Sequence, residues 1–136
     1  MKIKEIMTTG VVTAKPEETI KQVILRIRSK NISGLPIVNS NGKVIGVFSE
    51  TDVMKALPDI LNDAEAIPMI DVKEISDHHV RMLMSEPLYT LTPEDEVKEA
   101  ATIMLEKYVH RVPIIENGKL VGIVSLGDIL KAYTGN

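Results

Sequence analysis

The chain has 136 residues, of which 44% are hydrophobic and 26% are charged, and its formal net charge is −3. This length and composition fit one compact soluble domain. The absence of Cys excludes disulfides, thiolate zinc sites and a cysteine nucleophile. The slightly acidic balance argues against nucleic acid as a partner, and no apolar run reaches the length of a membrane span. We therefore expect a cytoplasmic protein that contacts no membrane.

The first predicted elements are a short strand at Val11–Thr13 and a helix that begins around Pro16–Thr19. Proline fits the first turn of a helix, and acidic residues suit its positive end. An apolar stripe at i, i+3, i+4 and i+7 follows, formed by Ile20, Val23, Ile24 and Ile27. This spacing predicts that one face of the helix packs on a core.

Two more strands are predicted at Leu35–Val38 and Val44–Phe48. The dipeptide Asn41-Gly42 between them is a strong hairpin signal, because both residue types adopt the positive φ values of tight turns. Since both runs are almost wholly apolar, we expect both faces of each strand to be covered. A short helix is predicted after Ser49. The acidic and apolar segment 58–80 is interpreted as a helical connector or a short flap that packs on the rest.

The second half of the chain repeats this order. A strand is predicted at Leu88–Thr90, a helix start at Thr92–Asp95, a hairpin at Val112–Ile115 and Leu120–Val124, and a short helix after Ser125. The second helix carries its own apolar stripe, formed by Val97, Ala100, Ala101 and Met104. A long period that occurs twice predicts a duplicated supersecondary unit rather than an open solenoid.

Two recurring peptides carry a resemblance to a known family. Leu-Pro-Ile-Val at Leu35–Val38 returns as Val-Pro-Ile-Ile at Val112–Ile115, and Gly-Val-Phe-Ser-Glu-Thr-Asp at Gly46–Asp52 returns as Gly-Ile-Val-Ser-Leu-Gly-Asp at Gly122–Asp128. With its two Asn-Gly hairpins, the duplicated order resembles the tandem CBS-domain pair, or Bateman module. The stretch Val109–Leu130 is also similar to the last repeat of the gamma subunit of AMP-activated protein kinase.

The resemblance implies a fold and a function. The fold is α+β, a pseudo-twofold pair of CBS (β-α-β-β-α) repeats in a single module, with repeat one at about residues 1–57, a connector at about 58–80 and repeat two at about 81–136. Clefts between the repeats would bind adenosyl ligands such as AMP, ADP, ATP or S-adenosylmethionine, and two chains would form a homodimer. We expect a ligand sensor that signals by conformational change, with a regulated protein partner. The alternative is a structural dimerisation or interaction module without a functional ligand site.

The motifs Ser49–Asp52 and Ser125–Asp128 carry the candidate chemistry. Their ordinary interpretation is a helix capping box, with Ser at the N-cap and an acid at N3. The same geometry offers N–H groups and a hydroxyl to phosphate, and a carboxylate to ribose hydroxyls. The resemblance assigns the ribose role to the two aspartates, and a polar contact near the phosphate or sugar to the two serines.

The resemblance also implies that each cleft mixes the two repeats. Val47 and Ile123 would pack on adenine, although an apolar strand residue is as readily part of the core. The cleft of Asp128 would add residues of repeat one, namely Gly10, Val12, Ile32 and Ser33. The cleft of Asp52 would add residues of repeat two, namely Pro87, Tyr89, Val109 and His110.

The pair His110-Arg111 distinguishes the second half, because the first half has Ser33-Gly34 at that place. A His-Arg pair on a surface is commonly only solvated. The pair matches a phosphate-contacting position of the family, and arginine offers a charge-assisted fork to phosphate. We therefore expect a phosphorylated nucleotide rather than S-adenosylmethionine, whose sulfonium is cationic.

No sequence pattern supports catalysis or a metal. Adjacent His78 and His79 would point apart on a helix and have no matched His or Cys partners. No Ser/His/Asp arrangement and no Gly-rich phosphate loop can be assigned. We expect no enzyme activity, no catalytic residue, no metal and no required cofactor.

Overall fold

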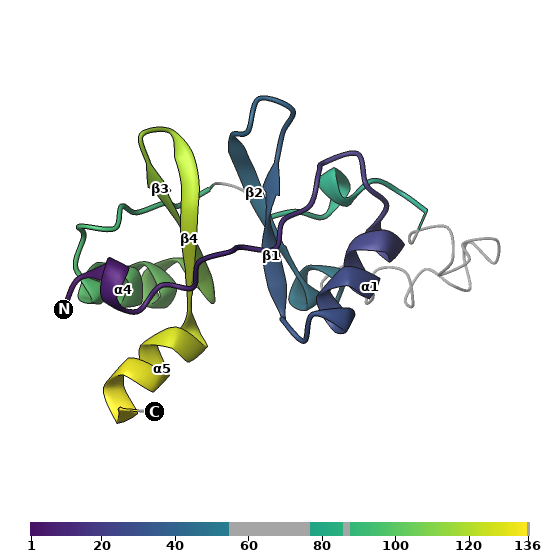
Figure 1. The fold of residues 1–136 in the computed structure, drawn as a ribbon. Coiled ribbons are helices and arrows are strands. Elements are labelled where there is room, and N and C mark those ends of the chain that lie inside the picture. Colours follow the sequence, from purple (N-terminus) through teal and green to yellow (C-terminus); the bar gives the residue numbers. More distant parts are fainter. Residues whose placement is uncertain (55–76, 86–87, 136) are drawn as a thin grey trace. The chain divides into compact units, whose positions relative to one another are not determined.

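The computed structural model describes residues 1–54, 77–85 and 88–135 (Figure 1). The chain divides into two compact units. One, here called the C-terminal unit, comprises Met1–Val11, Gly42–Val44 and Tyr89–Asn136. The other, the N-terminal unit, comprises Val12–Asn41 and Ile45–Leu88. Each unit therefore combines most of one sequence repeat with the opening segment of the other repeat. No helix in the described ranges is long and apolar enough to cross a membrane.

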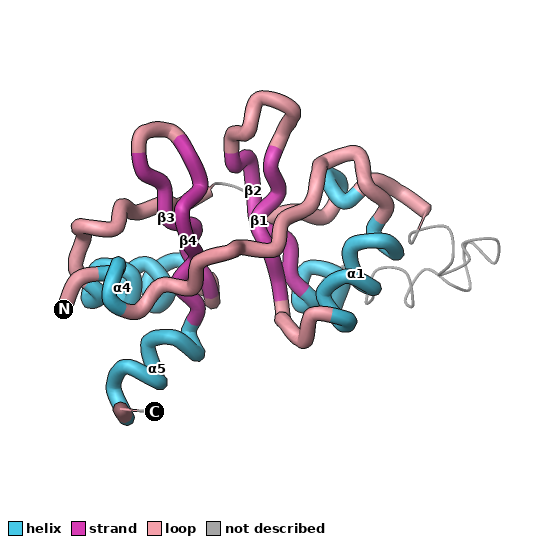
Figure 2. The backbone as a smooth tube through the Cα atoms, in the orientation of Figure 1, coloured by secondary structure: helices cyan, strands magenta, loops and turns pink. Residues whose placement is uncertain are grey.

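The N-terminal unit packs one helix and one strand pair around an aliphatic core. Its elements are α1 (Ile20–Ser29), β1 (Gly34–Val38), β2 (Val44–Ser49) and the 3-10 helix η2 (Val80–Met82), with β1 paired to β2 (Figure 2). Residues 50–54 are helical and follow β2 directly. The buried core is formed by Ala14, Ile20, Val23, Ile27, Leu35, Ile37, Phe48 and Val80. The helix and hairpin predictions for this half are confirmed.

The C-terminal unit has the same elements. They are the 3-10 helix η1 (Ile3–Glu5), α4 (Val97–Lys107), β3 (Arg111–Glu116), β4 (Lys119–Ser125) and α5 (Leu126–Thr134). Strand β3 pairs antiparallel with β4, and the turn between them has φ of 52° at Asn117 and 77° at Gly118. Positive φ at both central residues matches the twist of a tight hairpin, as predicted. The buried core is formed by Ile3, Ala100, Met104, Val112, Ile114 and Val124.

A segment distant in sequence completes each core. Ile3 is fully buried in the C-terminal unit, where its N–H donates to the carbonyl of Asp95 at 2.9 Å, and the purple N-terminal segment lies beside α4 (Figure 1). Val80 is fully buried in the N-terminal unit, where its N–H donates to the carbonyl of Glu18 at 2.8 Å. The segments that contain Ile3 and Val80 therefore have equivalent positions in the two units.

The strands predicted at Val11–Thr13 and Leu88–Thr90 are wrong. Each segment makes one isolated parallel bridge further along, between Ala14 and Ile37 and between Leu91 and Ile114. Turns follow at once at residues 16–18 and 93–95, so no longer strand can pair.

The first helix begins where it was predicted, and the second begins one residue later than predicted. The N-caps are Thr19 and Glu96, and the buried prolines Pro16 and Pro93 lie three residues earlier, in the turns. The expected covering of both strand faces is only partial, because Val47 is half-buried in β2. The connector prediction for 58–80 falls outside the described residues up to residue 76.

An exposed charge cluster ties the N-terminal segment to the C-terminal unit. Glu94 accepts hydrogen bonds from the ammonium groups of Lys2 at 2.7 Å and Lys4 at 2.9 Å. The hydrogen bond from Lys2, followed by that from Lys4, lowers the pKa of Glu94 from 4.5 to about 2. In the N-terminal unit, the side chain of Arg26 similarly lowers the pKa of Glu18 by donating to its carboxylate.

The charge cluster predicts an acid-sensitive contribution to stability. Because the pKa of Glu94 is lower in the folded chain, its contribution is complete above 4.5 and is lost as the pH falls towards about 2. Glu94→Gln is therefore expected to show a smaller fall in Tm on acidification, and the difference is small because the pair is exposed. Thermal denaturation across this pH range measures it. The exposed Glu106→Gln is the control, and parallel curves for the two variants would contradict the prediction.

Candidate functional site

Both serine–aspartate motifs lie where a strand ends and a helix begins. In the C-terminal unit, Ser125 is the N-cap of α5: its Oγ accepts from the N–H of Asp128 at 3.1 Å, and Asp128 Oδ2 accepts from the N–H of Ser125 at 2.9 Å. In the N-terminal unit, Asp52 Oδ2 accepts from the N–H of Ser49 at 2.8 Å. The reciprocal capping box predicted from the sequence is thus confirmed at Ser125, and its carboxylate half is present at Ser49.

A hydroxyl from the N-terminal segment reaches Asp128. Thr8 Oγ1 lies 3.2 Å from Oδ1 and 3.3 Å from Oδ2 of the carboxylate. Thr8 is fixed on β4, because its N–H and carbonyl both bond to the backbone of Ile123, at 2.9 Å and 3.0 Å. The preceding Met7 packs so closely on Gly122 that a Cβ there would lie 2.7 Å from the Met7 sulfur. A side chain at this point of β4 would force the Met7 side chain to move and would press on the Thr8 carbonyl at 3.1 Å.

The matching hydroxyl in the N-terminal unit belongs to Ser85. Its Oγ donates to Asp52 Oδ1 at 2.7 Å, and its N–H donates to the carbonyl of Val47 at 2.7 Å. Met84 packs on Gly46 in the same way, with its sulfur 2.8 Å from the place of a Cβ. Sequence reasoning missed both hydroxyls. The available signal was the alignment of Met7-Thr8 with Met84-Ser85 at the start of the duplicated segments.

The two carboxylates differ in burial. Asp52 is 5% exposed and Ser49 is 6% exposed, whereas Asp128 is half-buried. Asp52 Oδ2 also lies 3.3 Å from Ser49 Oγ, whose hydroxyl is 2.7 Å from that of Thr51. The Asp52 carboxylate is thus enclosed by donors, while Asp128 is only half-buried and its contact with Thr8 is exposed.

The remaining predicted residues of the N-terminal unit lie at the edge of its core. Val12 and Ile32 are half-buried and pack against that core, and Val47 bridges to Ser85. Ser33 is exposed, and its carbonyl accepts from the N–H of Glu50 at 3.1 Å.

The remaining predicted residues of the C-terminal unit surround the start of β3. Val109 packs against the core, and the exposed His110 accepts at its carbonyl from the N–H of Leu126 at 2.8 Å. Arg111 is half-buried as the first residue of β3. The half-buried Tyr89 ring has the ammonium of Lys107 5.7 Å from its centroid, a cation–π contact.

Three further predicted positions complete the comparison with the sequence. Gly10 is exposed with φ of 62°, and the half-buried Ile123 bridges to Thr8. Pro87 lies outside the described residues. The predicted clefts combine residues of the two units, which are described separately, so this combination stays a prediction.

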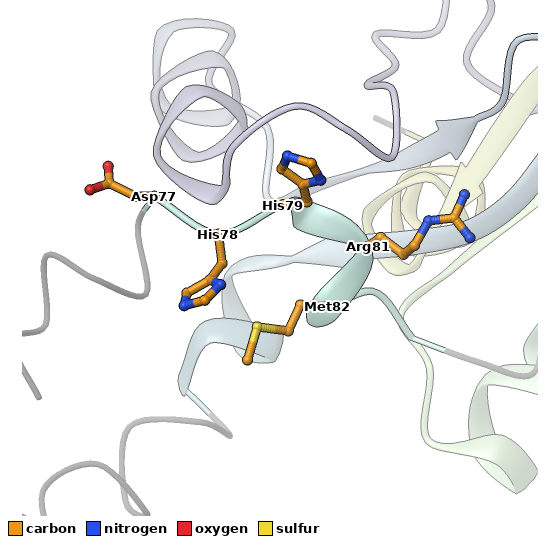
Figure 3. Close-up of a pocket in the computed structure, with 5 residues that line it drawn as sticks. All are labelled: Asp77, His78, His79, Arg81 and Met82. Atoms are coloured by element: carbon orange, nitrogen blue, oxygen red, sulfur yellow. The ribbon is translucent and has the colours of Figure 1, made fainter.

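His78 and His79 lie in the bend that precedes η2, and His79 forms an isolated bridge. They are therefore not on a helix, which the sequence interpretation had assumed. Together with Asp77, Arg81 and Met82, the two histidines line an open surface pocket, and their rings lie on opposite sides of the backbone (Figure 3). Among the residues that the structure describes, no three metal-ligating side chains form a cluster. The arrangement does not converge on an ion.

The CBS domain family matches residues 3–59 and 72–135 of the chain, which therefore belongs to this family. The predicted tandem CBS pair and its α+β fold are confirmed. The chain is 34% identical to an uncharacterized protein of Methanopyrus kandleri over 95% of its own length, but it spans only 61% of that relative.

Two solved structures share the fold. The CBS domain pair of protein MJ0100 superposes with a TM-score of 0.81 at 24% identity, covering 99% of this chain and 97% of that one. CBSX2 superposes with a TM-score of 0.77 at 23% identity, covering 98% and 96%.

Proposed function

We propose that the chain is a regulatory module that binds an adenosyl ligand and signals by a change of conformation. The observation that carries this proposal is the half-buried Asp128 at the start of α5, whose carboxylate keeps acceptor sites open. An ionised carboxylate offers about four acceptor sites, and its donors in the described part of the chain are the N–H of Ser125 and the hydroxyl of Thr8. Acceptor sites therefore remain for the two neighbouring hydroxyls of a ribose.

The family supports the adenosyl class of ligand. Protein MJ0100 was solved in complex with 5′-methylthioadenosine and S-adenosyl-L-methionine, and CBSX2 in complex with AMP. Adenosine is common to all three ligands, and only AMP carries a phosphate. Arg111 begins β3 in the C-terminal unit, His110 precedes it, and both offer donors to a phosphate. We therefore propose AMP, ADP or ATP ahead of S-adenosylmethionine.

A regulatory role follows from the family rather than from any catalytic group. CBS-domain pairs are regulatory modules, so the ligand is proposed to be sensed and not converted. A ligand shifts a conformational equilibrium only through unequal affinity for the two states. The protein that responds is proposed to be either this chain's own assembly or a separate partner.

Calorimetric titration tests the proposal against AMP, ADP, ATP, adenosine and S-adenosylmethionine. A true ligand is expected to saturate and to raise the Tm of the chain in proportion to the logarithm of its concentration, because it binds only the folded state. A chain that binds none of these ligands, and whose Tm is unchanged by each of them, would favour the structural dimerisation module instead.

We also propose a homodimer in solution. On α5, Leu130 is 55% exposed and Tyr133 is 90% exposed, and on α4 Leu105 is 79% exposed. Large apolar side chains gathered on short helices favour a partner surface, and a second copy of the chain is the simplest partner.

Light scattering at tens of micromolar protein is expected to give the mass of two chains. Leu130→Glu is expected to shift the mass towards one chain, because it places a charge on the proposed contact. Leu25→Glu, which changes an equally exposed leucine of α1, is the control. A monomeric mass for the parent, with and without nucleotide, would contradict the dimer.

A further inference from the structure

The hydroxyls of Ser85 and Thr8 have equivalent places in the two units but hold their aspartates differently. Ser85 Oγ donates to Asp52 Oδ1 at 2.7 Å, a normal length for a bond from a hydroxyl to a carboxylate. Thr8 Oγ1 lies 3.2 Å and 3.3 Å from the two oxygens of Asp128, so one proton is shared between two long contacts. The Ser85 contact is therefore the stronger of the two.

Burial increases this difference. Asp52 is 5% exposed, and a hydrogen bond to a carboxylate gains strength where water is excluded. Its Oδ2 accepts from the backbone N–H and lies near the hydroxyl of Ser49, and its Oδ1 is the oxygen that Ser85 holds. Asp128 is only half-buried and its contact with Thr8 is exposed, so water can compete for its oxygens.

We propose that the Ser85 hydroxyl competes with a ribose for the carboxylate of Asp52, and that a ribonucleotide consequently fills the Asp128 acceptor first. This inference rests on the proposed function. Because Ser49 and Ser85 already donate to the Asp52 carboxylate, the two neighbouring hydroxyls of a ribose have to compete with the short, partly buried hydrogen bond from Ser85, and the strength of that bond reduces the affinity. At Asp128 the competing contact from Thr8 is long and shared, so the affinity for ribose is reduced less. Ser85 is thus a specificity-determining residue, because it makes the affinity of Asp52 for ribose lower than that of Asp128.

The contacts around Ser85 allow its hydroxyl to be removed without releasing the segment. Its N–H bonds to the carbonyl of Val47 at 2.7 Å, and alanine keeps this bond. The side chain of Met84 stays packed against Gly46. Ser85→Ala therefore leaves the backbone anchored and changes the donors of one carboxylate.

The test measures AMP binding by calorimetry in single-aspartate backgrounds. With Asp128→Ala, Ser85→Ala is expected to tighten AMP binding about tenfold, the scale of a lost competing hydrogen bond to a charged group. With Asp52→Ala, the matched Thr8→Ala is expected to tighten it by less than about threefold, because its contact is long and shared. Thermal denaturation checks that each variant folds. In the parent chain, Ser85→Ala alone is expected to tighten the second AMP equivalent by the same factor.

A second ligand separates competition from simple blocking. The probe 2′,3′-dideoxy-AMP lacks both ribose hydroxyls, so Ser85→Ala is expected to leave its affinity unchanged. An equal gain for AMP and the dideoxy probe would overturn the inference, because Ser85 would then only obstruct access. A parent chain that binds AMP and is unaffected by Ser85→Ala would overturn the inference and leave the proposed function intact. Absence of AMP binding in the parent and all variants would overturn both.

Discussion

Asp128→Ala is expected to weaken AMP binding by about 1–3 kcal/mol, the cost of removing a charged hydrogen-bond acceptor from two ribose hydroxyls. Asp128 is half-buried at the first turn of α5, and its exposed contact with Thr8 leaves the carboxylate within reach of a ligand. Titration calorimetry measures the change. Adenosine is expected to lose affinity as AMP does, because both contain the ribose.

The control separates the ribose contact from helix capping. Asp128 also caps α5, and removing a cap costs about 1 kcal/mol of stability. Glu99 has the same capping position in α4, where its carboxylate accepts from the N–H of Glu96 at 3.0 Å. Glu99→Ala is therefore expected to lower Tm to a similar degree and to keep AMP binding. If Asp128→Ala, Asp52→Ala and the double variant all bind like the parent, the ribose role is wrong.

Arg111→Ala is expected to weaken AMP binding by about 1–3 kcal/mol and to change adenosine binding little, because only AMP carries a phosphate. Arg111 is the half-buried first residue of β3 and follows His110, whose exposed side chain can add a second donor. AMP binding is also expected to weaken as salt is added, since part of this contact is open to solvent.

The measurement compares AMP with adenosine in the parent and in Arg111→Ala. Arg28→Ala, which removes an exposed cation of α1, controls for the general effect of lost charge. Equal losses for AMP and adenosine would mean that Arg111 supports the fold. No loss for either ligand would mean that His110 and Arg111 are only solvated surface residues. It would also strengthen the alternative of a structural dimerisation module.

Features encoded by neighbouring residues could be predicted from the sequence. The stripe beginning at Ile20 gave the buried face of α1, and Asn117-Gly118 gave the turn between β3 and β4, because both signals act within a few residues. The capping of α5 by Ser125 follows from the same local logic. These predictions are confirmed.

Features that depend on distant pairing could not be predicted in this way. The run Val11–Thr13 has strand-forming residues, but whether it pairs depends on the turn at residues 16–18 and on β1. The hydroxyls of Thr8 and Ser85 reach their aspartates across 120 and 33 residues. No local pattern specifies that the opening segment of one repeat packs into the compact unit that the other repeat forms.

Because the repeats exchange segments, the boundaries of the two sequence repeats differ from those of the two compact units. A fragment that ends near residue 57 would keep β1 and β2 but would lack Val80, which is fully buried in their core. A fragment that begins near residue 81 would lack Ile3, which is fully buried against α4 and the β3–β4 hairpin side of the other core. Neither half of the sequence contains all the residues of its own hydrophobic core. Each duplicated half therefore depends on a segment of the other half to complete its core.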